Sequence, residues 1–128
     1  MNQNIIISQR ILRYAFGISL IVIGLDKVFH TNIITDWEKY VSPLALSVLP
    51  ITAVTLVSVL GTAEIAVGVF FFTRFCRIAA YVAIITLLAI IINLFSLGLY
   101  DIALRDALIA LSAYVFVLLT NTIENRNN

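Results

Sequence analysis

Residues 51–72 read ITAVTLVSVLGTAEIAVGVFFF. A helix that crosses a lipid bilayer needs about 20 mostly apolar residues, and this run satisfies that requirement. Three further stretches also do so, at residues 11–29, 78–97 and 102–119. The sequence therefore predicts an all-α polytopic membrane protein whose residues 1–128 form one bundle of four transmembrane helices.

The composition of the chain agrees with this fold class. Of its 128 residues, 62% are hydrophobic and 12% are charged, and the mean hydropathy is +1.07. Soluble domains are about 45–50% apolar and about 25% charged, so the composition excludes a soluble enzyme domain and a disordered chain. Because the net charge is only +1, we expect membrane lipids and no nucleic acid as partners.

The basic residues predict an orientation, because cytoplasmic flanks of spanning helices carry an excess of arginine and lysine. Five basic residues fall on the side of the two termini, namely Arg10, Arg13, Arg74, Arg77 and Arg126. Three fall on the other side, namely Lys27, Lys39 and Arg105. We therefore expect both termini in the cytoplasm.

The connection between the first two predicted spans mixes apolar and charged residues at roughly helical spacing. Its Trp37 and Tyr40 are of types enriched at membrane interfaces. We expect residues 33–40 to form an interfacial helix or half-helix on the outer face, with Pro43 and Pro50 before the second span. Four residues are candidate outer-face contacts: His30, Trp37, Tyr40 and Tyr100.

Six polar side chains are candidates for a cluster inside the bundle, where an ionisable residue is costly and needs a reason. Glu64 lies near the middle of its span on the face of Gly61 and Gly68, so it faces a neighbouring helix and is protonated or paired. Antiparallel packing brings the other five into one outer layer: Asp26, Lys27, Asn93, Arg105 and Asp106.

Within this layer we expect Lys27 to pair with Asp106. A direct contact between Lys27 and Glu64 is the alternative, although their heights differ by roughly 10 Å at about 1.5 Å per residue. Interhelical hydrogen bonds in membranes contribute only about 0.6 kcal/mol on average. A purely structural role and a functional role therefore both stay open for Glu64, whereas a structural role is favoured for Arg105 and Asp106.

The residue types predict no catalytic site and no metal site within this chain. Cys76 is the single cysteine, which excludes a thiol oxidoreductase that works by its own disulfide exchange. His30 is the single histidine, so a haem held by two histidines of one chain is not expected. The sequence also holds no metal-ligand spacing and no nucleophile beside an obvious base.

Short motifs along the chain resemble the DoxX family of small four-helix membrane proteins. Residues 13–17 read Arg-Tyr-x-x-Gly and residues 24–27 read Gly-Leu-Asp-Lys. Residues 61–68 read Gly-Thr-Ala-Glu-x-x-x-Gly, and an Arg-x-x-Arg pair follows at residues 74–77. The last element is Arg-Asp at residues 105–106.

The resemblance implies a small accessory subunit in a bacterial or archaeal cytoplasmic membrane, with a protein partner or a second copy of itself. The family name derives from a subunit of a thiosulfate:quinone oxidoreductase, so any redox role implied here would use a quinone or a partner's cofactor. The wider superfamily includes chaperone-like membrane proteins and relatives with redox thiols. The missing Cys-x-x-Cys departs from those relatives.

Two other functions stay open. The first is proton-coupled transport or binding of a small molecule through Glu64, which resembles small multidrug exporters that carry their glutamate in the first helix instead. The second is a quinone- or lipid-modifying enzyme with its site under Trp37 and His30, lined by Lys27, Glu64 and Asp106.

Overall fold

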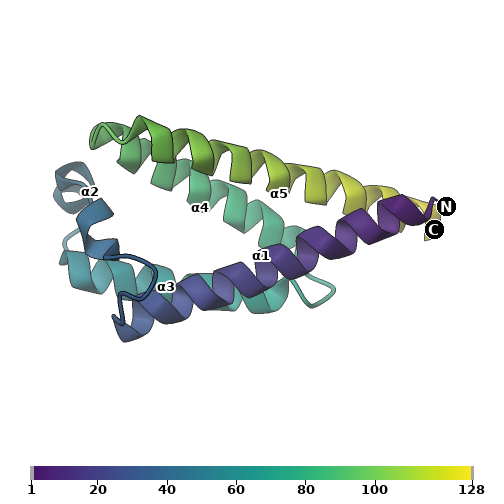
Figure 1. The fold of residues 1–128 in the computed structure, drawn as a ribbon, viewed down its shortest axis with the longest axis horizontal. Coiled ribbons are helices and arrows are strands. Elements are labelled where there is room, and N and C mark those ends of the chain that lie inside the picture. Colours follow the sequence, from purple (N-terminus) through teal and green to yellow (C-terminus); the bar gives the residue numbers. More distant parts are fainter. Residues whose placement is uncertain (1, 128) are drawn as a thin grey trace.

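The computed structural model describes residues 2–127, which are mostly helical and contain no strand. The elements in order are α1 (Gln3–Phe29), η1 (Trp37–Tyr40), α2 (Pro43–Val48), α3 (Ala53–Phe70), α4 (Cys76–Ser96) and α5 (Tyr100–Asn127). Figure 1 shows both termini at one end of the bundle and α2 at the other. We call residues 30–52 the strap and the end that it covers the strap end; the opposite end is the terminal end.

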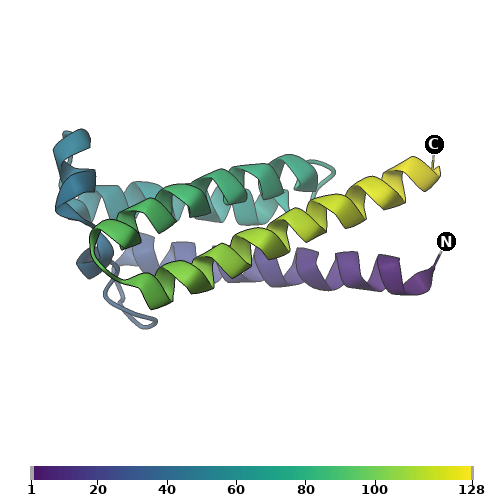
Figure 2. The same ribbon diagram turned by 90° about the horizontal axis from the view of Figure 1, so that it is seen from above.

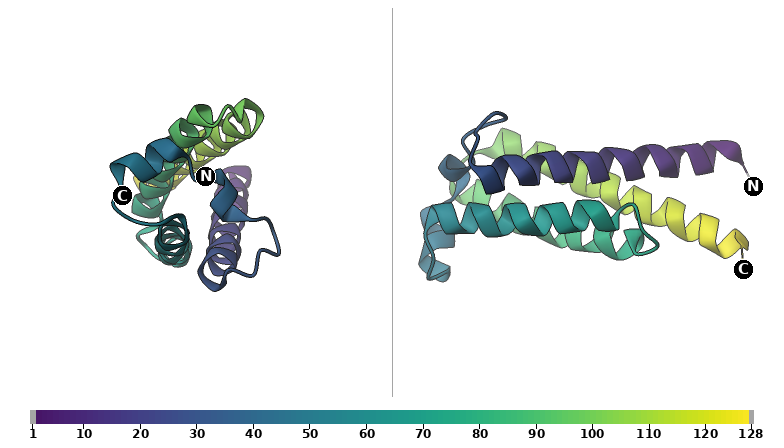
Figure 3. Two further views of the ribbon diagram at one scale, coloured as in Figure 1. Left: turned by 90° about the vertical axis from the view of Figure 1, so that its left-hand side faces the viewer. Right: turned by 90° about the horizontal axis from the view of Figure 1, so that it is seen from below.

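The four long helices run along one axis, and α2 lies across that axis at the strap end (Figures 2 and 3). α1 packs against α3, and α4 packs against α5. α1 also contacts α5, which joins the two pairs. Because α1 and α5 are longer than the helices between them, they extend past the α3–α4 turn at the terminal end.

Glycines set the close approach of α1 and α3. A Cβ atom on Gly24 would lie 2.6 Å from the backbone oxygen of Gly61. One on Gly68 would lie 2.9 Å from the backbone oxygen of Gly17. Small residues let membrane helices bring their backbones together, so these two contacts fix the antiparallel register of the pair.

The packed core lies where α3 ends and α4 begins. Phe71 and Phe116 are fully buried, with ring centroids 5.4 Å apart, and Cys76, Ala79 and Val117 pack in the same cluster. The outside of the bundle is apolar instead of charged, with many exposed isoleucine and leucine side chains. Of the four predicted spans, those in α3, α4 and α5 belong to helices long and apolar enough to cross a membrane, and the one in α1 does not.

The strap differs from the predicted helix over residues 33–40. Only Trp37–Tyr40 is helical, as a short 3₁₀ turn. The amides of Ile33 and Ile34 donate to Asp26 instead of to a helical carbonyl, which holds that segment in a bend outside any helix. A second short helix, α2, begins at Pro43 because the Ser42 side chain accepts from the Ala45 amide and caps it.

Candidate functional site

A buried ion pair joins α1 to α3 in the strap-end half of the bundle. Lys27 Nζ donates to Glu64 Oε1 at 2.7 Å, and the two side chains are only 9% and 10% exposed. Buried charges require a partner of opposite sign because desolvation of an isolated charge is costly. The sequence favoured Lys27–Asp106, and that prediction is wrong because the cation of Lys27 is bound to Glu64.

The Lys27–Glu64 contact forms although the two residues lie at different heights along the bundle, which had made Lys27–Asp106 the favoured pair. Lys27 lies one turn from Gly24 toward the strap end, and Glu64 lies one turn from Gly61 toward the terminal end. At about 1.5 Å per residue their backbones differ in height by about 9 Å. Helical side chains lean toward the N-terminus of their own helix. In an antiparallel pair Lys27 and Glu64 therefore lean toward each other.

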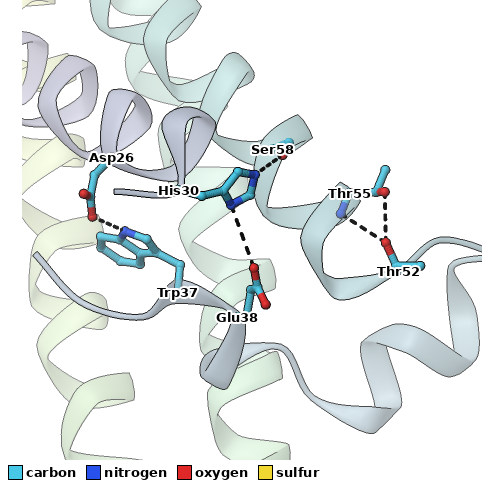
Figure 4. A network of polar contacts seen from close by, with 7 residues as sticks. All are labelled: Asp26, His30, Trp37, Glu38, Thr52, Thr55 and Ser58. Carbon is cyan, nitrogen blue, oxygen red and sulfur yellow. Dashed lines mark hydrogen bonds and ion pairs between the residues drawn. The ribbon is translucent and has the colours of Figure 1, made fainter. Parts of the chain in front are cut away.

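Trp37 covers this ion pair from the strap. Its ring lies over Lys27, with Nζ 4.7 Å from the ring centroid. Its indole nitrogen also donates to Asp26 Oδ2 at 2.6 Å, as Figure 4 shows. A cation–π contact is strongest where water is excluded, so one side chain both shields the lysine and fastens the strap to α1.

Asp26 organises the start of the strap. Its carboxylate accepts hydrogen bonds from the Thr31 hydroxyl, the Ile33 amide at 2.9 Å and the Ile34 amide at 3.3 Å, besides the indole of Trp37. The chain leaves α1 through His30, which has a positive φ of 51°. Two adjacent residues of the Gly-Leu-Asp-Lys motif at residues 24–27 thus have separate roles: Asp26 binds the strap, and Lys27 binds α3.

His30 connects the strap to the start of α3. Its Nε2 lies 2.9 Å from Ser58 Oγ, and its Nδ1 lies 3.8 Å from Glu38 Oε1 (Figure 4). Both the imidazole and Glu38 are partly exposed, so the contact between them is a surface interaction. His30 therefore lies at the edge of the strap, outside the Lys27–Glu64 pair.

Asn93 fastens the other side of the strap to α4. Its side-chain oxygen accepts from the Ser42 amide at 3.0 Å, and its side-chain nitrogen donates to the Tyr40 carbonyl. Ser42 is fully buried and Tyr40 is half-buried. Asn93 binds strap backbone, and the strap is held from both α1 and α4.

The last two candidates of the predicted cluster lie on α5. Asp106 is buried, whereas the Arg105 side chain is 68% exposed, and Arg105 Nε lies 3.5 Å from Asp106 Oδ1. Tyr100 is exposed at the start of the same helix, with its ring 5.4 Å from that of Phe95. The predicted cluster therefore divides into the Lys27–Glu64 pair, two strap anchors and a separate contact on α5.

Sequence reasoning missed the strap donors and one unsatisfied oxygen. Thr31 has no spacing that distinguishes it from an ordinary loop residue, so only the folded strap reveals its hydrogen bond to Asp26. Glu64 Oε2 is buried without a hydrogen-bond partner in the described chain. Among residues 2–127, no three His, Cys, Asp or Glu side chains come together so that they could hold a metal.

Two cavities at the surface of the bundle lie away from the ion pair. One, of about 290 Å³, is lined by Arg10, Arg13 and Arg74 at the terminal end. The other, of about 400 Å³, is an apolar groove between α4 and α5, lined by residues such as Leu88 and Ala110. Neither is lined by Lys27 or Glu64.

Comparison with known proteins gives one finding. A protein-family model described as DoxX matches residues 9–96, which is more than half of the chain. The match includes α3 and α4 and most of α1, with Lys27, Glu64 and the strap, and it ends before α5. No curated protein and no solved structure gives a significant match.

Proposed function

This chain belongs to the DoxX family, and we propose that it acts as a small accessory subunit of a larger membrane complex. Any redox step of that complex would use a quinone or a cofactor held by the partner. In this proposal the bundle is a rigid scaffold, and its function lies on the surface that it presents.

The observation that carries the proposal is how the polar side chains near the strap are used. Lys27 is bound by Glu64 and covered by Trp37, while Asp26 and Asn93 are bound to strap backbone. Groups that are fully engaged in holding a fold are poorly placed to bind a substrate. The strap itself exposes apolar side chains such as Ile33, which is 83% exposed. Exposed apolar patches mark surfaces that bind partners or lipid.

The proposal includes α1 as a fourth span. Within its apolar stretch, residues 11–29, α1 carries Arg13, Asp26 and Lys27, which is more charge than the other long helices carry within theirs. Its backbone touches that of α3 through glycines, and α3 is apolar enough to cross a membrane. Two helices packed side by side cross the same thickness of bilayer. With arginine in excess at the terminal end, both termini would face the cytoplasm of a bacterial or archaeal cell.

Native mass spectrometry tests the accessory role. The protein would be purified from its own host membrane in mild detergent, and the mass of each intact complex would be measured. We expect a second polypeptide at a fixed stoichiometry. Ile33→Asp should weaken the binding of that polypeptide about tenfold, because it places a charge on the exposed apolar surface of the strap. The fold of the strap should be kept, because the Ile33 amide still donates to Asp26. Arg126→Ala at the terminal end is the control and should leave the binding unchanged.

The possible outcomes separate the candidate assemblies. A chain found only with copies of itself would be a homo-oligomer, and a chain found alone would have no stable partner. Either result would reject the accessory role. A complex that persists unchanged in Ile33→Asp would move the partner contact away from the strap.

A second function, proton-coupled transport, is favoured by one oxygen atom of Glu64. Glu64 Oε2 is buried and without a hydrogen-bond partner in the described chain, so it has room on its lone pairs for a proton. This supports proton-coupled transport of a small molecule. A lipophilic dye cation in vesicles with an imposed pH gradient would test it. Uptake that Glu64→Gln abolishes would support transport, and absence of uptake at every gradient would reject it.

A further inference from the structure

The cavity at the terminal end is lined by three arginines from two parts of the chain. Arg10 and Arg13 come from α1, and Arg74 comes from the turn between α3 and α4. The cavity measures about 290 Å³, just below the roughly 300–1,000 Å³ typical of ligand sites. It can therefore hold a small group such as a phosphate with a short substituent.

The wall of the cavity is a built polar surface. Gln9 Nε2 donates to Thr120 Oγ1 at 3.2 Å, and Thr120 Oγ1 donates to the Phe116 carbonyl at 2.8 Å. Gln9, Thr120 and Cys76 are all buried. The first bond joins α1 to α5 beside the cavity, and the second, within α5, holds the Thr120 hydroxyl in place.

One N–H group of Arg13 has no hydrogen-bond acceptor at this site. Its Nη2 donates to Cys76 Sγ at 3.2 Å, which fixes the guanidinium against the start of α4. Its Nε is buried and has no acceptor in the part of the chain that the structure describes. Most buried donors in folded proteins have a partner, so an orphaned guanidinium N–H beside a cavity indicates a missing acceptor.

The acidic residue in the cavity lining, Glu124, is already paired with another arginine. Its Oε2 lies 2.8 Å from Arg77 Nη2. Arg77 Nη1 also donates to Asn121 Oδ1 at 2.6 Å, so two residues of α5, Asn121 and Glu124, hold Arg77. Within residues 2–127, no carboxylate pairs with Arg10, Arg13 or Arg74, so the cavity carries an excess of positive charge.

We propose that this cavity binds the phosphate group of an anionic ligand, and that the ligand is a membrane phospholipid. Guanidinium groups match phosphate oxygens in charge and in fork geometry, and basic pockets between spanning helices bind anionic headgroups. The apolar side chains of Ile6 and Ile123 also line the cavity, and Ile7 and Ile11 are exposed beside it on α1. A lipid would place its phosphate among the arginines and its acyl chains along these isoleucines.

Lipid titration followed by native mass spectrometry tests the site on the purified full-length chain. The probes are phosphatidylglycerol and phosphatidylcholine with identical acyl chains. We expect the wild-type chain to bind phosphatidylglycerol at least about tenfold more tightly. The double variant Arg10→Gln/Arg74→Gln, in which both side chains are exposed, should lose about tenfold in that affinity. Arg13→Gln should lose a similar factor, and Arg126→Gln, at the same end but outside the cavity, less than about twofold.

Inorganic phosphate separates the two sources of the phosphate group. If millimolar phosphate leaves lipid binding unchanged, the site is a headgroup site. If phosphate displaces the lipid, and the same arginine variants weaken phosphate binding, the cavity is a phosphate site without lipid selectivity. Equal affinity for both lipids, or wild-type affinity in the double variant with its thermal unfolding unchanged, would overturn the proposal.

Discussion

The two ends of the bundle use their charges in opposite ways. At the strap end, Lys27 is bound to Glu64, and Asp26 accepts hydrogen bonds from the strap. At the terminal end, the arginines that line the cavity have no described carboxylate partner, and Arg13 has an orphaned N–H. One small chain thus uses buried charges to hold its fold at one end and leaves arginines without a described carboxylate partner at the other. Matched charges hold the strap end closed, and unmatched charges leave the terminal end ready for an anion.

Breaking the buried ion pair should produce the largest effect. Glu64→Leu leaves the Lys27 cation buried without its partner, and such a loss costs about 3–5 kcal/mol. SDS-induced unfolding of the purified protein would measure the change in the free energy of unfolding. Arg126→Ala at the other end is the control, with an expected change below about 0.5 kcal/mol. Equal and negligible changes in the two variants would remove the special role of Glu64.

Separating α1 from α3 should have the next largest effect. A Cβ atom on Gly61 would lie 2.7 Å from the Lys27 Cβ and 2.8 Å from the Gly24 oxygen. Gly61→Ala must therefore push the helices apart, at a cost of about 1–3 kcal/mol in the same unfolding measurement. Ala66→Leu, on the exposed face of α3, should be nearly neutral. A neutral Gly61→Ala would contradict the close backbone contact.

Loosening the strap should have a local effect. Trp37→Phe keeps an aromatic ring near Lys27 but removes the N–H that donates to Asp26. The amides of Ile33 and Ile34 should then exchange hydrogen about tenfold faster, whereas the helices keep their protection. Tyr100→Phe, at the same end, is the control. Unchanged exchange in Trp37→Phe would show that the indole N–H does not fasten the strap.

The smallest effect is expected on α5. The Arg105 side chain is exposed, and its contact with Asp106 is long at 3.5 Å. Although Asp106 is buried, the exposed Arg105 guanidinium is screened by solvent, so Arg105→Gln should change the free energy of unfolding by less than about 1 kcal/mol. A loss as large as that of Glu64→Leu would instead include Arg105 in the buried network.

Hydropathy predicted α3, α4 and α5 as spans because lipid imposes length and composition on a helix, whereas the fourth predicted span, in α1, is not among the helices apolar enough to cross a membrane. It could not find the helix ends: α1 begins at Gln3 and α5 continues to Asn127, since polar residues continue a helix once it leaves lipid. The strap was predicted less well, because its shape depends on side-chain acceptors instead of helical carbonyls: Asp26 binds the start of the strap, and Asn93 binds Ser42 from a distant part of the sequence.

The candidate site was also predicted only in part from the sequence. The expectation that Glu64 faces a neighbouring helix followed from its glycine neighbours on the same face. Its partner could not be chosen from heights alone, because the antiparallel lean of the side chains closes the distance to Lys27. The cavity at the terminal end was not predicted, because it depends on where α5 lies relative to α1.

The central claim is that the Lys27–Glu64 pair serves the fold and that the function lies on the surface of the bundle. Its most direct test is the double variant Lys27→Met/Glu64→Leu, because replacing both members of a buried ion pair with apolar side chains is often neutral or stabilising. Native mass spectrometry would measure the second polypeptide bound per chain. The account predicts a stable bundle that keeps the wild-type stoichiometry. A stable double variant that has lost its partner would contradict it and assign the pair a direct functional role.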